Sequence, residues 1–155
     1  MSIEITIKLV QELRDATGIS VMQCKNALIE AEGDMKKALA ILKKTSSDIA
    51  LKKVDRELGA GYIEAYLHGG GRIGAMIELD CETDFVAKNE VFRTLAKEIA
   101  MQIAATNPAD LSMLLEEPFI KNPDMTITKL IEEAIQKTGE RIKIGNFARF
   151  ELPQK

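Results

Sequence analysis

The sequence contains few of the residues on which most enzyme and metal sites depend. Its 155 residues include one histidine, two cysteines and no tryptophan, and only 5% of them are aromatic. These counts exclude histidine-rich metal centres, zinc ribbons and disulfide frameworks. Lys and Arg number 21 and Asp and Glu number 24, which gives a net charge of −3. This balance argues against a dedicated nucleic-acid-binding protein, because such proteins carry a basic surface.

Long apolar runs and targeting signals are missing from the sequence as well. No stretch reaches the ~18 apolar residues that a membrane-spanning helix needs. The opening segment MSIEITIKLVQEL carries acidic residues and lacks the basic-then-apolar order of a signal peptide. We therefore expect a cytoplasmic protein that does not enter a membrane, with Cys24 and Cys81 as reduced thiols.

Residues 1–45 predict a bundle of three helices, because apolar residues recur there at helical spacing. The expected N-caps are Thr6, Ser20 and Asp34, and the expected stops are Gly18 and Gly33. Ser20 and Gln23 have the spacing of a capping box. The second helix is expected to bury Val21 together with Cys24, Leu28 and Ala31. Met22 is either part of this core or an adaptable surface contact for a partner.

Residues 46–56 form a polar segment between this bundle and the remainder of the chain, residues 57–155. We expect a connector that is helical after Ser47. The basic side chains in and near it are Lys43, Lys44, Lys52, Lys53 and Arg56. Two interpretations stay open: a solvated linker face, or a surface that contacts RNA or an acidic partner.

Residues 57–155 predict an α+β domain. Alternation of side chains predicts three strands, at residues 61–68, 72–81 and 142–152, the first two joined by Gly69-Gly70-Gly71 as a hairpin. In the third strand, one face is expected to carry Ile142, Ile144, Ala148, Phe150 and Leu152. Helical spacing recurs at residues 88–105 and 126–138, the latter with Thr126 as cap and Gly139 as stop. This order predicts an antiparallel three-stranded sheet with helices packed on one face.

The segment ELDCETDFVAKNE has an acid at every second position, namely Glu78, Asp80, Glu82 and Asp84. If the strand continued unbroken, all four would share one face, where they could hold a hard cation or form a solvated surface. The absence of calcium-loop spacing favours the solvated surface. Phe85 follows where the strand must turn into a helix, and it is either a core residue or a wedge for a partner's pocket.

No catalytic or cofactor-binding set emerges from the sequence. A G-x-x-x-x-G-K-[ST] loop and a Rossmann fingerprint are both missing. Cys81 and His68 fall on opposite faces of the predicted hairpin, which disfavours a thiol nucleophile. We expect no metal site, no cofactor and no covalent chemistry, which favours a protein that acts by binding.

Several segments resemble, in order, those of the bacterial translation elongation factor Ts family. They are ELRDATGISVMQCKNAL, HGGGRIG, CETDFVAKNEVF and EEPFIKNPDMTITKLIEEAIQKTGERIKIGNFARFEL. The resemblance covers nearly the whole chain. It implies a guanine-nucleotide exchange factor that binds elongation factor Tu, in its GDP-bound and nucleotide-free states, and promotes GDP release during translation elongation.

The resemblance also implies roles for particular residues. Thr83, Asp84, Phe85 and Val86 match the family's exchange motif, and Asp84 and Phe85 would insert near the partner's magnesium and phosphate site. Arg14, Val21 and Met22 match partner-binding positions of a ubiquitin-associated-like N-terminal module. No direct contact with nucleic acid is expected, although an RNA-associated translation accessory module is the alternative. The oligomeric state stays open, with a homodimer as one option.

The sequence departs from the family pattern at one place. In the family, a helical segment of several tens of residues usually separates the Asn-Pro after the core helix from the Pro-Phe motif. Here only ADLSMLLEE lies between Pro108 and Pro118. We therefore expect that helical segment to be absent, while the exchange motif and the N-terminal module are retained.

Overall fold

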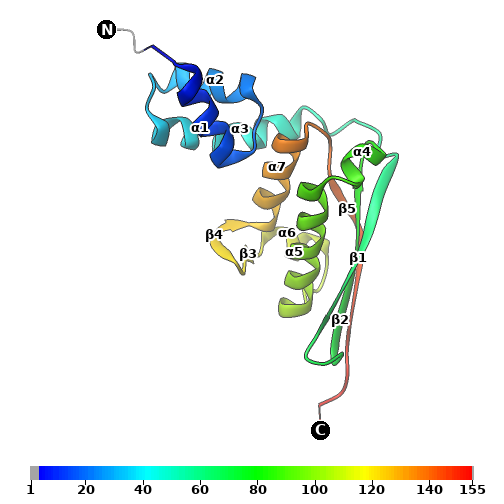
Figure 1. Ribbon diagram of the computed structural model, residues 1–155. Coiled ribbons are helices and arrows are strands. Elements are labelled where there is room, and N and C mark those ends of the chain that lie inside the picture. Colours follow the sequence, from blue (N-terminus) through cyan, green and yellow to red (C-terminus); the bar gives the residue numbers. More distant parts are fainter. Residues whose placement is uncertain (1–3, 155) are drawn as a thin grey trace.

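Helices and strands follow the predicted α+β order in the computed structural model, which describes residues 4–154 (Figure 1). The N-terminal helices are α1 (Ile7–Thr17), α2 (Val21–Glu30) and α3 (Met35–Leu51). The main sheet contains β1 (Ala60–His68), β2 (Ile73–Cys81) and β5 (Lys143–Glu151). Between β2 and β5 come α4 (Asp84–Ala87), α5 (Glu90–Thr106), α6 (Leu111–Glu116), β3 (Pro118–Phe119), β4 (Asn122–Thr126) and α7 (Ile127–Thr138).

The three N-terminal helices begin where the sequence predicts. The side chains of Thr6, Ser20 and Asp34 each accept a hydrogen bond from the backbone N–H three residues later, at 3.2, 3.4 and 3.0 Å. These bonds satisfy donors that a helix start would otherwise leave unpaired. The prediction that Val21 is buried is wrong: it is the first residue of α2 and is 49% exposed.

Helix α3 is longer than predicted and joins the two modules. The expected connector is helical from its start, because α3 runs without a break from Met35 to Leu51. Hydroxyl groups do not interrupt it: Thr45 donates to the carbonyl of Ile41 at 2.6 Å and Ser46 to that of Lys43 at 2.8 Å, both within the helix.

Buried apolar side chains form two separate clusters, one within the N-terminal helices and one between the sheet and helices α5 and α7. The first half of α3 contributes Ala38 and Leu42 to the small cluster, and its second half packs Ile49 and Ala50 against the large one. A single helix therefore connects both cores. The boundary at residue 45 stays a prediction.

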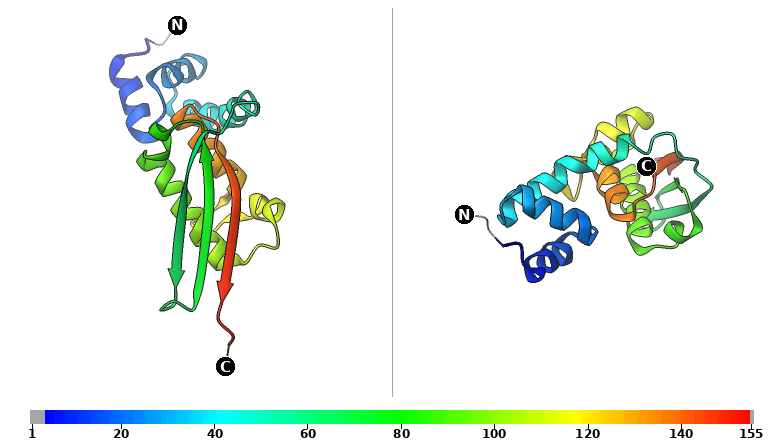
Figure 2. Two further views of the ribbon diagram at one scale, coloured as in Figure 1. Left: turned by 90° about the vertical axis from the view of Figure 1, so that its right-hand side faces the viewer. Right: turned by 90° about the horizontal axis from the view of Figure 1, so that it is seen from above.

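The main sheet is antiparallel in the order β1-β2-β5, and Figure 2 shows the helices gathered on one face of it. This confirms the predicted fold class. The central strand β2 buries Ala75, Ile77, Leu79 and Cys81 beneath α5. The short helix α6 and the hairpin β3–β4 were not predicted, because elements of six, two and five residues are too short to show a period.

The prediction that one face of the third strand holds all five apolar residues is wrong. Ile142 and Ile144 are buried, but Phe150 is 73% exposed. The pairing of β2 with β5 shifts register between Glu78 and Leu79, where Gly145 is the extra residue. Such a bulge inverts the alternation beyond it, so that Ala148 and Phe150 turn to the face without helices. We call this face, with Ile63, Leu67, Met76 and Phe150, the outer sheet face.

In the part of the chain that the structure describes, no helix has both the length and the apolar character needed to cross a bilayer.

The bulge at Gly145 makes room for two carboxylates on the outer sheet face. A Cβ atom at Gly145 would overlap Oε2 of Glu78 and lie 2.5 Å from Oδ2 of Asp80. Burial, followed by the hydrogen bond and the charge of Glu78, raises the pKa of Asp80 from 3.8 to about 6, against the opposing effect of Lys143. Because the folded state raises this pKa, ionised Asp80 opposes folding, and stability falls as the pH rises from about 4 to 6.

We therefore expect Asp80→Asn to raise the melting temperature at pH 7.5. Solvent screening limits the gain in the free energy of unfolding to about 1 kcal/mol or less. The gain should shrink toward pH 4.5, where the native carboxyl is already protonated. Thermal denaturation across this pH range, with the exposed Asp124→Asn as a matched control, measures the effect. A gain that is equal at both pH values would contradict the prediction.

Candidate functional site

The predicted exchange motif, Thr83–Val86, lies where β2 ends and the single turn α4 begins. The side chain of Thr83 caps this turn by accepting a hydrogen bond from the Val86 N–H at 3.4 Å. Val86 is 9% exposed and packs into the large core, whereas Phe85 is 90% exposed. The interpretation of Phe85 as a core residue is therefore wrong.

An exposed phenylalanine on an ordered turn is a strong candidate for a partner contact. Full burial of such a side chain contributes about 2 kcal/mol, and this free energy is unused in the isolated chain. Asp84 is also exposed and occupies the first position of α4, where a negative charge is favourable. The motif thus divides into two residues that fasten it, Thr83 and Val86, and two that project, Asp84 and Phe85.

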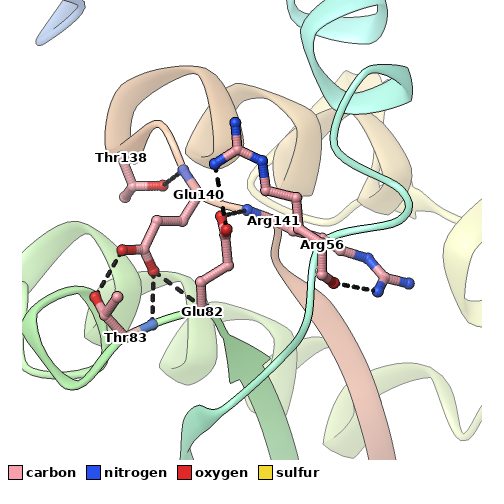
Figure 3. Close-up of polar contacts among 6 residues, drawn as sticks. All are labelled: Arg56, Glu82, Thr83, Thr138, Glu140 and Arg141. Carbon is pink, nitrogen blue, oxygen red and sulfur yellow. Dashed lines mark hydrogen bonds and ion pairs between the residues drawn. The ribbon is translucent and has the colours of Figure 1, made fainter.

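A carboxylate from a distant segment holds the start of this motif (Figure 3). Glu140, in the turn between α7 and β5, accepts hydrogen bonds from the backbone N–H of Glu82 at 3.1 Å and of Thr83 at 3.0 Å. Its second oxygen accepts from the Thr83 hydroxyl at 2.6 Å. Three donors at the strand–helix junction therefore converge on one side chain.

A second carboxylate, that of Glu82, accepts hydrogen bonds from the segment that carries Glu140 and from the segment after α3. Glu82 accepts from the backbone N–H of Arg141 at 2.7 Å and from the Arg56 guanidinium at 3.3 Å. The Arg141 guanidinium donates in turn to the carbonyl of Arg56 at 2.8 Å. We call these bonds of Glu82, Thr83, Glu140, Arg141 and Arg56 the Glu140 clamp. It joins the end of β2, the start of β5 and the segment after α3 (Figure 3).

Sequence reasoning missed Glu140 and Arg141 and treated Arg56 as a linker cation. Their partners in the clamp lie 26 to 85 residues away in the chain. A single sequence carries no signal for pairs at that separation. The one local hint is that Glu140 and Arg141 follow the helix stop Gly139, where a turn exposes side chains to neighbouring strands.

The four alternating acids do not share one face, because the strand ends at Cys81. Glu78 and Asp80 lie on the outer sheet face, Glu82 is part of the Glu140 clamp, and Asp84 starts α4. Among residues 4–154, no group of three His, Cys, Asp or Glu side chains is placed to hold a metal ion.

Cys81 and His68 do not form a catalytic pair. They lie at opposite ends of the β1–β2 hairpin, where Cys81 pairs with Ala60 and His68 with Ile73. Burial and the nearby charge of Glu140 raise the pKa of the Cys81 thiol to about 11. The thiol therefore stays protonated at neutral pH, and it donates to the carbonyl of Thr83 at 3.3 Å.

The second predicted contact region lies on the N-terminal module. Arg14 and Val21 line a groove of about 390 Å³, together with Ile5, Ile7, Val10, Gln11 and Lys25. Met22, 67% exposed, follows Val21 at the start of α2. Ile7 is 86% exposed and was missed by sequence reasoning, although an apolar residue away from the buried face of a helix was a usable signal. We call Arg14, Val21 and Met22 the N-terminal patch.

We expect Glu140→Gln to weaken the clamp, because a neutral amide keeps the shape but loses charge-assisted hydrogen bonds. The free energy of unfolding should fall by about 1–3 kcal/mol. Hydrogen exchange of the Glu82 and Thr83 amides should accelerate. Urea denaturation and exchange measured by NMR test both effects.

The exposed Glu116→Gln serves as the control for this prediction and should change neither quantity. Unchanged protection of the Thr83 amide in Glu140→Gln would show that the clamp does not hold the motif.

Comparison with known proteins gives consistent results along the chain. The family model for elongation factor Ts matches residues 82–155, which include most of the Glu140 clamp and the whole exchange motif. The proteins named elongation factor Ts from Heliobacterium modesticaldum and Carboxydothermus hydrogenoformans are 39% and 42% identical to the chain. These alignments cover 96% of this chain and 90% and 89% of the two relatives.

A third relative, elongation factor Ts from Caldanaerobacter subterraneus subsp. tengcongensis, is 41% identical over 95% of this chain and 96% of its own length. The alignments extend over 192 or 193 positions, more than the 155 residues of this chain, so the relatives contain residues without a counterpart here. With about 40% identity over nearly its entire length, the chain belongs to the elongation factor Ts family.

Proposed function

We propose that the chain is a guanine-nucleotide exchange factor that binds elongation factor Tu and promotes GDP release during translation elongation. The observation that carries this proposal is Phe85, which is 90% exposed on a turn fixed by the Glu140 clamp, within a member of the elongation factor Ts family. The factor performs no covalent chemistry of its own and needs no cofactor. It acts on its partner's nucleotide only through binding.

In this proposal, Asp84 and Phe85 insert beside the partner's magnesium and phosphate site. Phe85 supplies apolar wedge area, and the Asp84 carboxylate competes for groups that hold the magnesium ion and the phosphates. By linkage, a factor that weakens GDP binding is itself bound less tightly when GDP is present, by the same free energy. Thr83 and Val86 act indirectly, because they keep the turn in one conformation.

The N-terminal patch supplies the second contact of the proposed complex. Val21 and Met22 offer apolar area at the start of α2, and Arg14 adds a cation at the edge of the groove. Figure 1 places α1 and α2 at the same end of the molecule as α4. One partner can therefore contact the N-terminal patch and the exchange motif together.

We also propose that nucleic acid is not a direct partner. Arg56 is engaged with Glu82 in the Glu140 clamp, and Asp48 and Asp55 lie among the remaining basic side chains. The alternative, an RNA-associated accessory module, requires Lys43, Lys44, Lys52 and Lys53 to contact phosphates, with affinity that falls steeply with salt.

The outer sheet face supports a homodimer as a further part of the proposal. Ile63, Leu67, Met76 and Phe150 are 59%, 72%, 47% and 73% exposed on neighbouring strands. A group of large apolar side chains on one face is unusual on a monomer and fits an interface. A second copy of the chain offers the same apolar side chains, so a two-fold axis through this face buries both groups.

Phe85→Ala tests the exchange mechanism. The maximal rate of GDP release should fall by about 10- to 100-fold, because a contact of hot-spot size is lost. Stability should not change, since the side chain is exposed in the free factor. Release of a fluorescent GDP analogue from elongation factor Tu, measured by stopped flow, gives the rate. Ile120→Ala, which removes another exposed apolar side chain, is the control, and an unaltered rate in Phe85→Ala would refute the wedge role.

Phe150→Asp tests the homodimer. If the outer sheet face is buried between two copies, a charge at Phe150 on this face should convert a dimer into a monomer, as measured by light scattering coupled to size-exclusion chromatography. Ile29→Asp, a substitution at an exposed position of α2, should leave the mass unchanged. A parent protein that is monomeric at high concentration would contradict this part of the proposal.

A further inference from the structure

Helices α3 and α7 are joined by polar contacts that do not involve any residue of the exchange motif. The Lys129 ammonium donates to the Ser46 hydroxyl at 2.6 Å, to the Ser47 hydroxyl at 3.5 Å and to the carbonyl of Lys43. Two turns further along α7, the Gln136 side chain donates to the carbonyl of Leu42 at 2.9 Å. Both donors therefore lie on the same face of α7, and both form hydrogen bonds to the middle of α3.

These contacts range from buried at Gln136 to partly exposed at Lys129, and they depend on hydrogen bonding. Ser46 is 0% exposed and Gln136 is 3% exposed. The three oxygens that accept hydrogen bonds from Lys129 carry no charge. When the ammonium loses part of its hydration here, these hydrogen bonds are its compensation, because no carboxylate pairs with it in these bonds. Beside the contact, a crevice of about 180 Å³ remains between the N-terminal helices and α7, lined by Thr17, Leu39, Leu42, Glu133, Gln136 and Lys137 among others. Apolar packing at this junction is therefore incomplete.

We propose that Lys129 and Gln136 are positioning residues that hold the N-terminal module in the orientation needed for exchange. This inference rests on the proposed function for its catalytic consequence. The N-terminal patch lies on the helices around the small core, and the exchange motif lies beside the large core. The distance between them therefore depends on how the two modules are joined. Helix α3 sets the distance between the modules, and the hydrogen bonds of Lys129 and Gln136 to α3 set the angle between them.

The expected consequence follows from the arithmetic of linked contacts. When two patches are held on one rigid body, the second contact forms at high effective concentration. If the modules pivot, only the correctly oriented fraction binds with both patches, and the apparent affinity falls in proportion to that fraction. The exchange motif itself is unaltered, so the rate within the assembled complex should not change.

The first experiment tests the orientation directly and needs no partner. Spin labels are attached to Glu12→Cys on α1 and Lys97→Cys on α5, both exposed, while Cys24 and Cys81 are fully buried. Double electron–electron resonance should give a narrow distance distribution in the labelled parent and in Lys129→Arg, which keeps donors. Lys129→Met, which keeps the aliphatic stem but no donor, should give a broad distribution. An equally narrow distribution in Lys129→Met overturns the proposal.

The second experiment measures exchange against factor concentration. Lys129→Met should raise the half-saturating concentration about tenfold and change the maximal rate by less than about twofold. Lys129→Arg should restore the parent value, and Lys97→Met, an exposed lysine of α5, should match the parent. A reduced maximal rate with an unchanged half-saturating concentration would overturn the positioning role.

Folding of Lys129→Met is checked by urea denaturation. If this variant does not fold, Ser46→Ala removes one acceptor of Lys129 and takes its place in both experiments. The two failures are distinguishable. A parent protein that never accelerates GDP release refutes the proposed function, whereas the distance distributions still decide whether the contact sets the orientation.

Discussion

The hydrogen bonds from the strand–helix junction to Glu140 are the constraint on which the rest of the site depends. Where β2 stops, the N–H groups of Glu82 and Thr83 leave the ladder of the sheet and need new acceptors. One carboxylate, 57 and 58 residues further along the chain, supplies them, and Glu82 returns the bond to the Arg141 N–H. The junction can therefore turn sharply without leaving these backbone N–H groups unpaired. Helix α4 then leaves the sheet with Phe85 exposed to solvent.

This arrangement fits the proposed role of Phe85 as a wedge in a protein with few chemically reactive residues. A wedge has to be exposed before binding and must not collapse onto its own core. Val86 and Ala87 pack inward on the same turn, at 9% and 4% exposure, so Phe85 is left on the opposite side. Binding does not have to order a side chain whose backbone is already held in one conformation. The entropic cost of association is therefore lower, which favours tight binding.

Local features and the three strands of the main sheet were predictable, whereas contacts between particular distant residues were not. The caps at Thr6, Ser20 and Asp34 and the hairpin around Gly69–Gly71 depend on residues a few positions apart, and all were identified from the sequence. The outward turn of Phe150 depends on a bulge that a regular period of two cannot reveal. Glu140 was missed for a similar reason, because its role depends on β5 lying beside β2. The exposure of Phe85 was left open by periodicity, since one turn of helix is too short to show a face.

The connection between Pro108 and Pro118, where we predict the family's helical segment to be missing, is anchored to the core by one side chain. Gln102, fully buried on α5, donates to the Glu117 carboxylate at 3.0 Å and to the carbonyl of Pro118 at 3.1 Å, and accepts from the Ile120 N–H at 3.0 Å. This one side chain fastens α6 and β3 to the core and closes the segment without a longer helical excursion. Figure 1 places β3 and β4 at the start of α7, whereas Glu140 follows its end. A change in length at one end of α7 is thus separated by the whole helix from the bonds that hold the exchange motif at the other.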